Sequence, residues 1–249
     1  MRTLFGGLVT IVLTLTLGTA VVIASLLGVP TRKDSFYERL AHWWVSAISW
    51  AAGAKIVVHG GSHFRSARHV FVANHVSWLD VTILASLLAH FRFVAKAEIA
   101  RWPLFGAVFR SIGTVYIERT NRKAAFDSYR DAAERIRQGA SVVVFPEGTR
   151  GKGYALRPFK KGPFVLAISA QAPVVPTVVH GTLEALPRGR MWVRAGRVHV
   201  HFLEPVSTAG MTYEDRDALA KTVHDRMAQL LQEEYGVRSP EWKPRGNGA

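Results

Sequence analysis

Three polar clusters follow short segments rich in β-branched residues, at the points where predicted strands end. They are Asn74-His75-Val76-Ser77-Trp78-Leu79-Asp80 after His69–Ala73, Glu118-Arg119 after Thr114–Ile117, and Pro146-Glu147-Gly148-Thr149-Arg150 after Ser141–Phe145. Active sites of parallel α/β sheets collect at the carboxyl ends of the strands. We therefore expect the three clusters to lie at one edge of a sheet.

The first cluster contains a histidine and a carboxylate that could perform acid–base chemistry. On one continuous helix, His75 and Asp80 would point about 140° apart. If His75 lies in the loop before the helix and Asp80 in its first turn, the two side chains can meet. The carboxylate would then fix the imidazole tautomer, and the other ring nitrogen could take a proton from a hydroxyl group. The alternative is structural: Ser77 and Asp80 have the spacing of a capping box, and His75 can be a hydrogen-bonded structural histidine.

Basic residues at neighbouring strand ends predict an anion site. Arg119 and Arg150 each follow a strand, and Lys96 follows the predicted strand Phe91–Ala95. Together they could bind a phosphate group. Alternatively, each side chain reaches solvent, or Arg150 forms an ion pair with Glu147 or Asp80. No Walker A motif or paired-glycine fingerprint is present, so a nucleotide-binding fold is not supported.

From about Lys55, β-branched segments alternate with helical ones. The predicted strands are Ile56–His59, His69–Ala73, Phe91–Ala95, Thr114–Ile117, Ser141–Phe145, Val174–Val179 and Arg197–Phe202, and the predicted helices are Arg122–Gln138, Phe164–Gln171 and Tyr213–Tyr235. This pattern predicts an α/β fold with a largely parallel, mixed sheet flanked by helices. The apolar stripe of the last helix is expected to face the core. Met191–Phe202, with Ala195-Gly196 between two runs, predicts a hairpin at one edge.

The N-terminal segment is predicted to be a membrane-embedded helix. No charged residue occurs between Arg2 and Arg32. About 20 apolar residues cross the bilayer core as a helix, so Thr3–Pro30 is long enough. A signal peptide has a shorter apolar core of about 7–15 residues, and a buried core helix is usually shorter as well. These two remain the alternatives.

The following segment, Ala41–Gly53, is apolar but too short to span a bilayer. Its tryptophans, Trp43, Trp44 and Trp50, favour an interfacial helix along the membrane surface. An amphipathic helix packed on the domain is the alternative. We divide the chain into an N-terminal membrane anchor with interfacial helices (1–54), an α/β domain (55–239) and a C-terminal tail (240–249) that is expected to be loose.

Composition excludes several function classes. The 249 residues include 32 Lys and Arg against 18 Asp and Glu, a net charge of +14, and 49% are apolar, which is enough for a full core. The absence of cysteine excludes disulfides, cysteine-ligated zinc, iron–sulfur clusters and a cysteine nucleophile. A nucleic-acid-binding protein would explain the charge but not the uncharged N-terminal run. A non-catalytic membrane scaffold would leave His75, Asp80 and Arg150 without a role.

Four ordered motifs resemble the blocks of the glycerolipid acyltransferases, and in particular the bacterial 1-acyl-sn-glycerol-3-phosphate acyltransferases. They are Asn74-His75-x-Ser77-x-x-Asp80, Gly113-x-x-Tyr116-Ile117-x-Arg119, Phe145-Pro146-Glu147-Gly148-Thr149-Arg150 and Val175-Pro176, with Lys96-x-Glu98-x-x-x-x-Pro103 similar to an additional block. The departures are Tyr116 where Phe is usual, Ile99 where Leu is usual, and Thr177 where an aliphatic residue is usual.

The resemblance implies a role for each matching residue. His75 would be the general base and Asp80 its orienting partner. The phosphate of the acceptor would be held by Lys96, Arg119 and Arg150, in a pocket shaped by Glu147, Gly148 and Thr149. Backbone N–H groups at the helix start after His75 are candidate oxyanion donors.

The reaction implied is transfer of a fatty acyl group from acyl-CoA or acyl carrier protein to the 2-hydroxyl of lysophosphatidic acid, giving phosphatidic acid. No metal or other cofactor is expected, since a thioester is already activated. The expected partners are membrane lipids and the acyl donor, without nucleic acid. The expected location is the inner membrane of a bacterium, with the site facing the cytoplasm. Lyso-ornithine lipid and glycerol-3-phosphate are the alternative acceptors.

Overall fold

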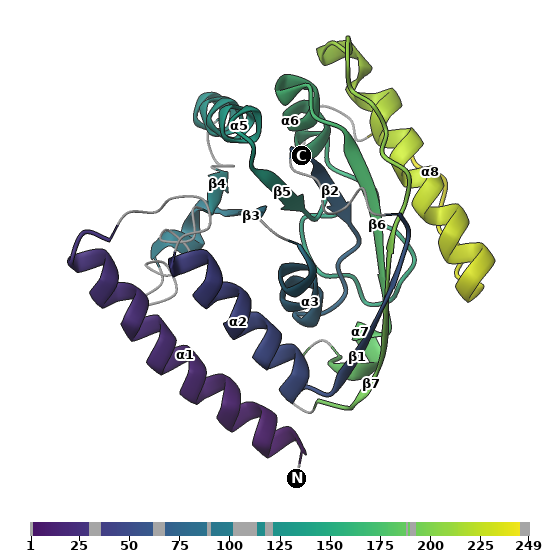
Figure 1. The fold of residues 1–249 in the computed structure, drawn as a ribbon. Coiled ribbons are helices and arrows are strands. Elements are labelled where there is room, and N and C mark those ends of the chain that lie inside the picture. The colour runs from purple at the N-terminus through teal and green to yellow at the C-terminus, as the bar shows by residue number, and fades with distance from the viewer. Residues whose placement is uncertain are drawn as a thin grey trace.

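A computed structural model describes residues 2–29, 36–61, 68–88, 91–101, 114–117, 122–187, 189 and 193–244 of the chain. In this part, the strands form one seven-stranded sheet with the order β1-β7-β6-β2-β5-β3-β4 (Figure 1). The strands are β1 Ala54–His59, β2 Val70–Ala73, β3 Phe91–Lys96, β4 Val115–Ile117, β5 Ser141–Val144, β6 Val174–His180 and β7 Gly196–Phe202. Neighbouring strands are parallel except for β6 and β7. The predicted α/β fold with a largely parallel, mixed sheet is confirmed.

Helices cover both faces of this sheet. They are α1 Arg2–Leu26, α2 Phe36–Ala51, α3 Leu79–Leu87, α5 Arg122–Arg137, α6 Gly162–Ala170, α7 Thr182–Ala185 and α8 Arg216–Tyr235, with short 3₁₀ helices η2 Ala97–Arg101 and η3 Tyr213–Asp215. One face is covered by α5, α6 and α8, and the other by α2 and α3 (Figure 1). The central strands β2 and β5 are fully buried, as expected for parallel strands covered on both faces.

The C-terminal helix α8 turns its apolar stripe towards the sheet. Leu219, Val223, Met227 and Leu231 are buried in the same hydrophobic cluster as β2 and β6, and Leu230 packs against that cluster. The predicted core-facing role of this stripe is therefore confirmed.

The N-terminal helix α1 lies outside the domain core. It contains the stretch Phe5–Ala24, which is long and apolar enough to cross a membrane. Only 18% of that stretch is buried, so the alternative of a buried core helix is wrong. Large apolar side chains along it, such as Leu8 at 62% and Ile11 at 59%, are exposed. The surface of α1 is thus suited to contact with lipid rather than water.

The second helix, α2, joins α1 to the domain. The indole Nε1 of Trp44 donates to the hydroxyl of Thr14 on α1 at 3.3 Å, while α2 itself packs on α3 and β1. Its Trp43 and Trp50 remain 55% and 69% exposed. Thus α2 packs on the domain, as expected for an amphipathic helix of the domain. It also presents exposed tryptophans, as expected for an interfacial helix.

Two details of the predicted C-terminal half are corrected by the structure. The hairpin within Met191–Phe202 is wrong: residues 193–195 form no strand, and β7 pairs with β1 in parallel and with β6 antiparallel. Apolar alternation identifies a strand but does not identify its partner. The expected looseness of the tail is also wrong for its described part, because Trp242 is 6% exposed and belongs to the same hydrophobic cluster as α8.

Candidate active site

The loop after β2 places His75 at the carboxyl edge of the sheet. The side-chain amide of Asn74 donates to the carbonyl of Val179 on β6 at 3.0 Å and accepts the N–H of the same residue at 2.8 Å. This buried pair of hydrogen bonds fixes the start of the loop. Since α3 begins at Leu79, His75 lies in the loop and Asp80 in the first turn of the helix, as predicted.

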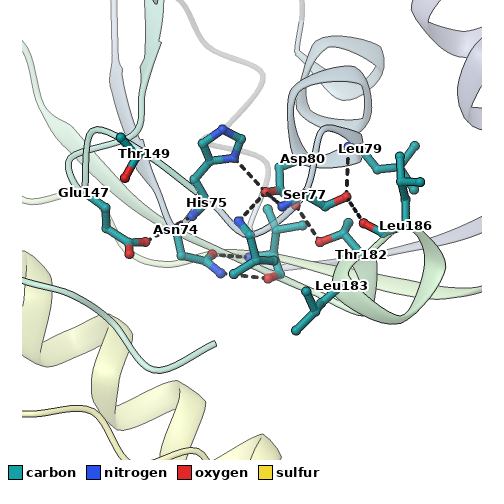
Figure 2. A network of polar contacts seen from close by, with 12 residues as sticks. Asn74, His75, Ser77, Leu79, Asp80, Glu147, Thr149, Thr182, Leu183 and Leu186 are labelled. Atoms are coloured by element: carbon teal, nitrogen blue, oxygen red, sulfur yellow. Dashed lines mark hydrogen bonds and ion pairs between the residues drawn. The ribbon is translucent and has the colours of Figure 1, made fainter. Parts of the chain in front are cut away.

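The carboxylate of Asp80 is fully buried and accepts four hydrogen bonds (Figure 2). Its Oδ2 accepts from His75 Nδ1 at 2.9 Å and from the backbone N–H groups of Val76 and Ser77 at 2.7 and 2.8 Å. Its Oδ1 accepts from the hydroxyl of Thr182 at 2.5 Å. Burying a carboxylate without such donors would raise the free energy of the folded state. The predicted meeting of His75 and Asp80 is confirmed.

The imidazole of His75 is held between this carboxylate and an aromatic ring. It stacks on Phe145, with ring centroids 4.1 Å apart. Its side chain is 13% exposed. Figure 2 shows the second ring nitrogen pointing away from Asp80. With Nδ1–H donating to the carboxylate, Nε2 carries the lone pair and is the atom that can accept a proton.

The same aspartate also organises the start of α3. Asp80 accepts the N–H of Ser77. The hydroxyl of Ser77 in turn accepts the N–H of Leu79 at 3.3 Å and donates to the carbonyl of Leu186 at 2.8 Å. Asp80 therefore makes both the helix-start contacts of the structural alternative and the His75 contact that the catalytic alternative needs. The N–H groups of Val76, Ser77 and Leu79 are engaged within this network, so the expectation that they serve as oxyanion donors is wrong for these three groups.

Glu147 connects the loop after β5 to the histidine loop. Its carboxylate accepts the N–H of His75 at 3.1 Å and the Nε–H of Arg157 at 3.1 Å. Burial raises the pKa of Glu147, and the bonds from His75 and Arg157 oppose that shift. Arg157 also donates to the carbonyl and the hydroxyl of Thr149, each at 2.7 Å. Glu147 and Thr149 thus fix the 146–150 turn beside His75.

Arg150 lies next to the histidine loop. The N–H of the following residue, Gly151, donates to the carbonyl of His75 at 2.7 Å. The guanidinium of Arg150 is 4.8 Å from the ring of Trp78, which is 55% exposed. Glu147, one ion-pair partner considered for Arg150, forms an ion pair with Arg157.

The turn itself requires a glycine at position 148. Gly148 has a φ of +77°, and a Cβ at this position would come within 2.8 Å of Lys160 Cε. Glycine adopts this left-handed conformation without steric cost. Across this turn the chain passes from the buried Glu147 to the exposed Thr149 and the half-buried Arg150.

The remaining two predicted residues are placed only in part. Lys96 is the last residue of β3, whose carboxyl end lies at the same sheet edge because β3 is parallel to β5; its side chain lies outside the described part. Arg119 follows β4 and lies outside the described residues. The structure thus brings together His75, Asp80, Glu147, Gly148, Thr149 and Arg150. The catalytic and substrate-binding roles of these residues, and of Lys96 and Arg119, remain predictions.

Two residues of the site were not predicted from the sequence. Thr182, which bonds to Asp80, is 102 positions away from it and carries no local signal. Arg157 stands in a basic, glycine-containing stretch that predicts an exposed loop cation, yet its partner, Glu147, is buried. Asn74 and Phe145 stand in the quoted motifs, but no role could be predicted for either.

A partly exposed histidine backed by a buried carboxylate lies at the carboxyl edge of a largely parallel α/β sheet, and this arrangement can perform the acid–base chemistry of group transfer or hydrolysis. A family model described as Acyltransferase matches residues 55–180. Because this match spans half of the chain and contains the His75 site, the chain belongs to the acyltransferase family.

Curated relatives divide between two kinds of acceptor. A 1-acyl-sn-glycerol-3-phosphate acyltransferase of Cocos nucifera is 31% identical over 71% of this chain, and the match spans 58% of that protein's length. A lyso-ornithine lipid O-acyltransferase of Pseudomonas aeruginosa is 29% identical over 82% of this chain and 81% of its own.

A solved structure shares the fold. The 1-acyl-sn-glycerophosphate acyltransferase PlsC of Thermotoga maritima superposes with a TM-score of 0.74, covering 95% of this chain and 97% of that chain, at 24% sequence identity. Since this structural similarity covers 95% of the chain, it extends beyond residues 55–180 to the N-terminal helices.

Proposed function

We propose that this protein is an O-acyltransferase that moves a fatty acyl group from an acyl thioester to the 2-hydroxyl of lysophosphatidic acid, with phosphatidic acid as the product. One observation carries the proposal: the fully buried carboxylate of Asp80 holds His75 Nδ1 at 2.9 Å and leaves the other ring nitrogen facing outward. Family membership and the names of the relatives support the reaction class.

In this mechanism, His75 acts as a general base. Its Nε2 takes the proton from the acceptor hydroxyl while that oxygen attacks the thioester carbonyl. The carbon–oxygen bond forms, the carbon–sulfur bond breaks, and the imidazolium returns the proton to the departing thiolate. Asp80 stays ionised and stabilises the imidazolium. The chain's residues supply the proton transfer and the thioester supplies the activated carbonyl, so the proposal requires no metal or other cofactor.

A phosphorylated acceptor is favoured by the basic residues at this edge. The guanidinium of Arg150 lies over the ring of Trp78, in the loop that contains His75, and can hold two phosphate oxygens at once. Lys96 is the last residue of β3 and Arg119 follows β4, both of which run parallel to β5, and we propose that the two complete the phosphate site. Lyso-ornithine lipid, named for the Pseudomonas aeruginosa relative, is the second candidate acceptor, and glycerol-3-phosphate the third.

A membrane location follows from the substrate and from the exposed apolar surface. Trp78 is 55% exposed and lies three residues from His75, while Trp43 and Trp50 are exposed on α2. Tryptophans favour the headgroup region of a bilayer. We propose that residues 1–54 anchor the 55–239 domain to the inner membrane of a bacterium, with the site facing the cytoplasm. The charge of +14 favours an anionic leaflet, at about 1 kcal/mol per well-placed basic residue.

An acceptor panel tests the proposal directly. Purified full-length protein in detergent is given labelled acyl-CoA with lysophosphatidic acid, lyso-ornithine lipid or glycerol-3-phosphate, and each product is measured. We expect the highest kcat/KM with lysophosphatidic acid. Transfer to lyso-ornithine lipid alone would replace the acceptor, and no transfer to any of the three would contradict the proposed function. Repeating the assay with acyl carrier protein identifies the donor.

The role of Arg150 is tested by a substitution that keeps its charge. Arg150→Lys loses the planar fork, so we expect the KM for lysophosphatidic acid to rise about tenfold, equivalent to about 1.4 kcal/mol, while the KM for the acyl donor changes little. The matched control is Arg226→Lys on α8, over the sheet face opposite α2. Equal changes in both KM values, together with a lower melting temperature, would indicate that Arg150 only holds the loop.

A further inference from the structure

A second group of histidines lies on the sheet face opposite α2. His59 on β1 and His201 on β7 are direct neighbours in the parallel register, and His199 precedes His201 by two residues. Side chains at positions i and i+2 of a strand share one face. Val198 and Val200, on the alternate positions of β7, are buried in the cluster that includes α2 and α3. The three imidazoles therefore share the face that α8 covers.

The three rings converge closely. His59 Nε2 and His199 Nδ1 are 2.9 Å apart, and the rings of His59 and His201 stack with centroids 4.2 Å apart. Each ring offers one nitrogen, and these nitrogens all lie within 4.8 Å of one another. Two imidazole nitrogens at 2.9 Å must share a proton, since two lone pairs at that distance would repel. A metal ion can replace that proton and bind both nitrogens.

A neighbouring phenol supports the orientation of one ring. The hydroxyl of Tyr235, the last residue of α8, lies 2.6 Å from His201 Nε2. Metal-binding histidines usually use their second ring nitrogen for a hydrogen bond of this kind, which fixes the tautomer. With Nε2 engaged by this hydroxyl, the other ring nitrogen of His201 is the one that can face the neighbouring imidazoles.

We propose that His59, His199 and His201 form a binding site for a divalent transition-metal ion of the zinc type, with Tyr235 as the hydrogen-bond partner of one ligand. Imidazole nitrogen suits Zn²⁺, Co²⁺, Ni²⁺ and Cu²⁺, whereas Mg²⁺ and Ca²⁺ prefer oxygen ligands. Tetrahedral Zn²⁺ with bonds of about 2.0–2.1 Å holds its nitrogen ligands about 3.3 Å apart. Binding would require side-chain rotations that widen the 2.9 Å spacing of His59 and His199 and bring the His201 nitrogen to a similar distance.

The site would join an edge strand to the sheet. In the described part of the chain, β1 pairs with β7 alone, and β1 begins three residues after the end of α2. A metal ion bound to His59 on β1 and to His199 and His201 on β7 would therefore cross-link the two strands. The expected consequence is greater stability of the strand that leads from the N-terminal helices into the domain.

Metal titration tests the site. Full-length protein without a polyhistidine tag is purified in detergent, stripped with a chelator, and titrated with Zn²⁺ against a chromophoric chelator. We expect one ion per chain, and an affinity at least about tenfold weaker for His199→Gln and for His59→Gln, because loss of even an outer-sphere partner usually costs about 10–100-fold. Tyr235→Phe should weaken binding less than either. The matched control, His42→Gln, changes an exposed histidine of α2 and should bind as the wild type does.

A spectroscopic readout separates loss of ligands from loss of fold. Co²⁺ bound by three imidazoles in a tetrahedral site absorbs strongly in the visible range, so the wild type and His42→Gln should become coloured and His199→Gln should not. Circular dichroism checks that each variant is folded, and His59→Gln on the edge strand provides a second test if His199→Gln unfolds. Equal Zn²⁺ affinity in the wild type and both folded variants, or binding that never saturates at one ion per chain, would overturn the proposal.

Discussion

Two groups of histidines in this protein differ in what faces each ring. At the carboxyl end of β2, His75 faces a fully buried carboxylate. On the face covered by α8, His59, His199 and His201 face one another and the hydroxyl of Tyr235. A carboxylate stabilises the imidazolium and so favours proton transfer, whereas imidazole and phenol neighbours leave neutral lone pairs that suit a metal ion. Histidines in the same protein can therefore differ in chemistry because different groups face their rings.

One turn, at Gly181, separates a residue that contacts Asp80 from a residue that contacts Tyr235, the phenol beside the second group. The last residue of β6, His180, stacks on the C-terminal tyrosine of α8 at 3.8 Å, whereas Thr182 donates to Asp80. Between them, Gly181 has a φ of +96°, and a Cβ there would overlap the carbonyl oxygen of Arg197. Glycine at this position lets the chain pass from β6 directly into α7, so that His180 and Thr182 reach the two different groups.

The largest expected effect follows from removing His75, the proposed general base. His75→Ala should lower kcat/KM for acyl transfer by about 10²–10⁴-fold, because it removes the proton acceptor while leaving the backbone bond to Glu147 in place. The measurement is the initial rate with labelled acyl-CoA, together with the melting temperature and the membrane-bound fraction. His42→Ala should retain wild-type values of all three. A folded His75→Ala protein with wild-type rates would remove the catalytic half of the comparison.

Asp80→Asn distinguishes the catalytic role of this residue from its capping role. Asparagine can still accept the N–H bonds of Val76 and Ser77, but it cannot stabilise the imidazolium. We expect a loss in kcat of about 10²–10⁴-fold, as in other enzymes whose orienting aspartate is replaced, with a smaller loss in stability. If activity persists while the melting temperature falls, Asp80 is mainly a helix cap.

Metal removal should affect the second histidine group alone. Zn²⁺ at 100 times its Kd contributes about 2.7 kcal/mol to the native state, so chelation should lower the melting temperature of the Zn²⁺-loaded protein by about 5–10 °C. The rate of acyl transfer by His75, measured in the same samples, should not change. A rate that falls in parallel with the metal content would show that the two groups are coupled, in which case the turn at Gly181 is the first segment to investigate.

The smallest effect concerns pH and the buried carboxylate of Glu147. Burial raises its pKa above 4.5, so the folded state binds more protons than the unfolded state between those two pKa values. Its stabilising contribution is present below pH 4.5 and is lost as the pH rises through the folded pKa. Glu147→Gln should therefore gain stability relative to the wild type as the pH rises.

A companion variant tests the cause of this pH dependence. Arg157 lowers the pKa of Glu147, so Arg157→Met should raise that pKa further and reduce the free energy of unfolding at pH 7 by about 1–3 kcal/mol. Denaturant unfolding in detergent at pH 4.5 and pH 7 measures both effects. If the wild type and Glu147→Gln differ by the same amount at both pH values, Glu147 does not titrate in this range.

Local sequence patterns determined the elements and the strand-end loops. The alternation and β-branching of His69–Ala73 and Ser141–Phe145 predicted two central strands, and the polar residues after them include His75, Asp80 and Arg150. The side-chain period of a strand or helix depends on neighbouring residues alone, so it can be read from the chain. The resemblance to acyltransferase motifs used the same short segments.

Only the tertiary structure decided which distant groups meet. Thr182 reaches Asp80 across 102 positions, and His59 meets His199 across 140 positions. The sequence assigned β7 to a hairpin because adjacent apolar runs are the simplest partners, whereas the sheet places β7 between β1 and β6. The physical reason is that strand pairing depends on the summed packing of both sheet faces, and that sum has no counterpart in any local stretch of residues.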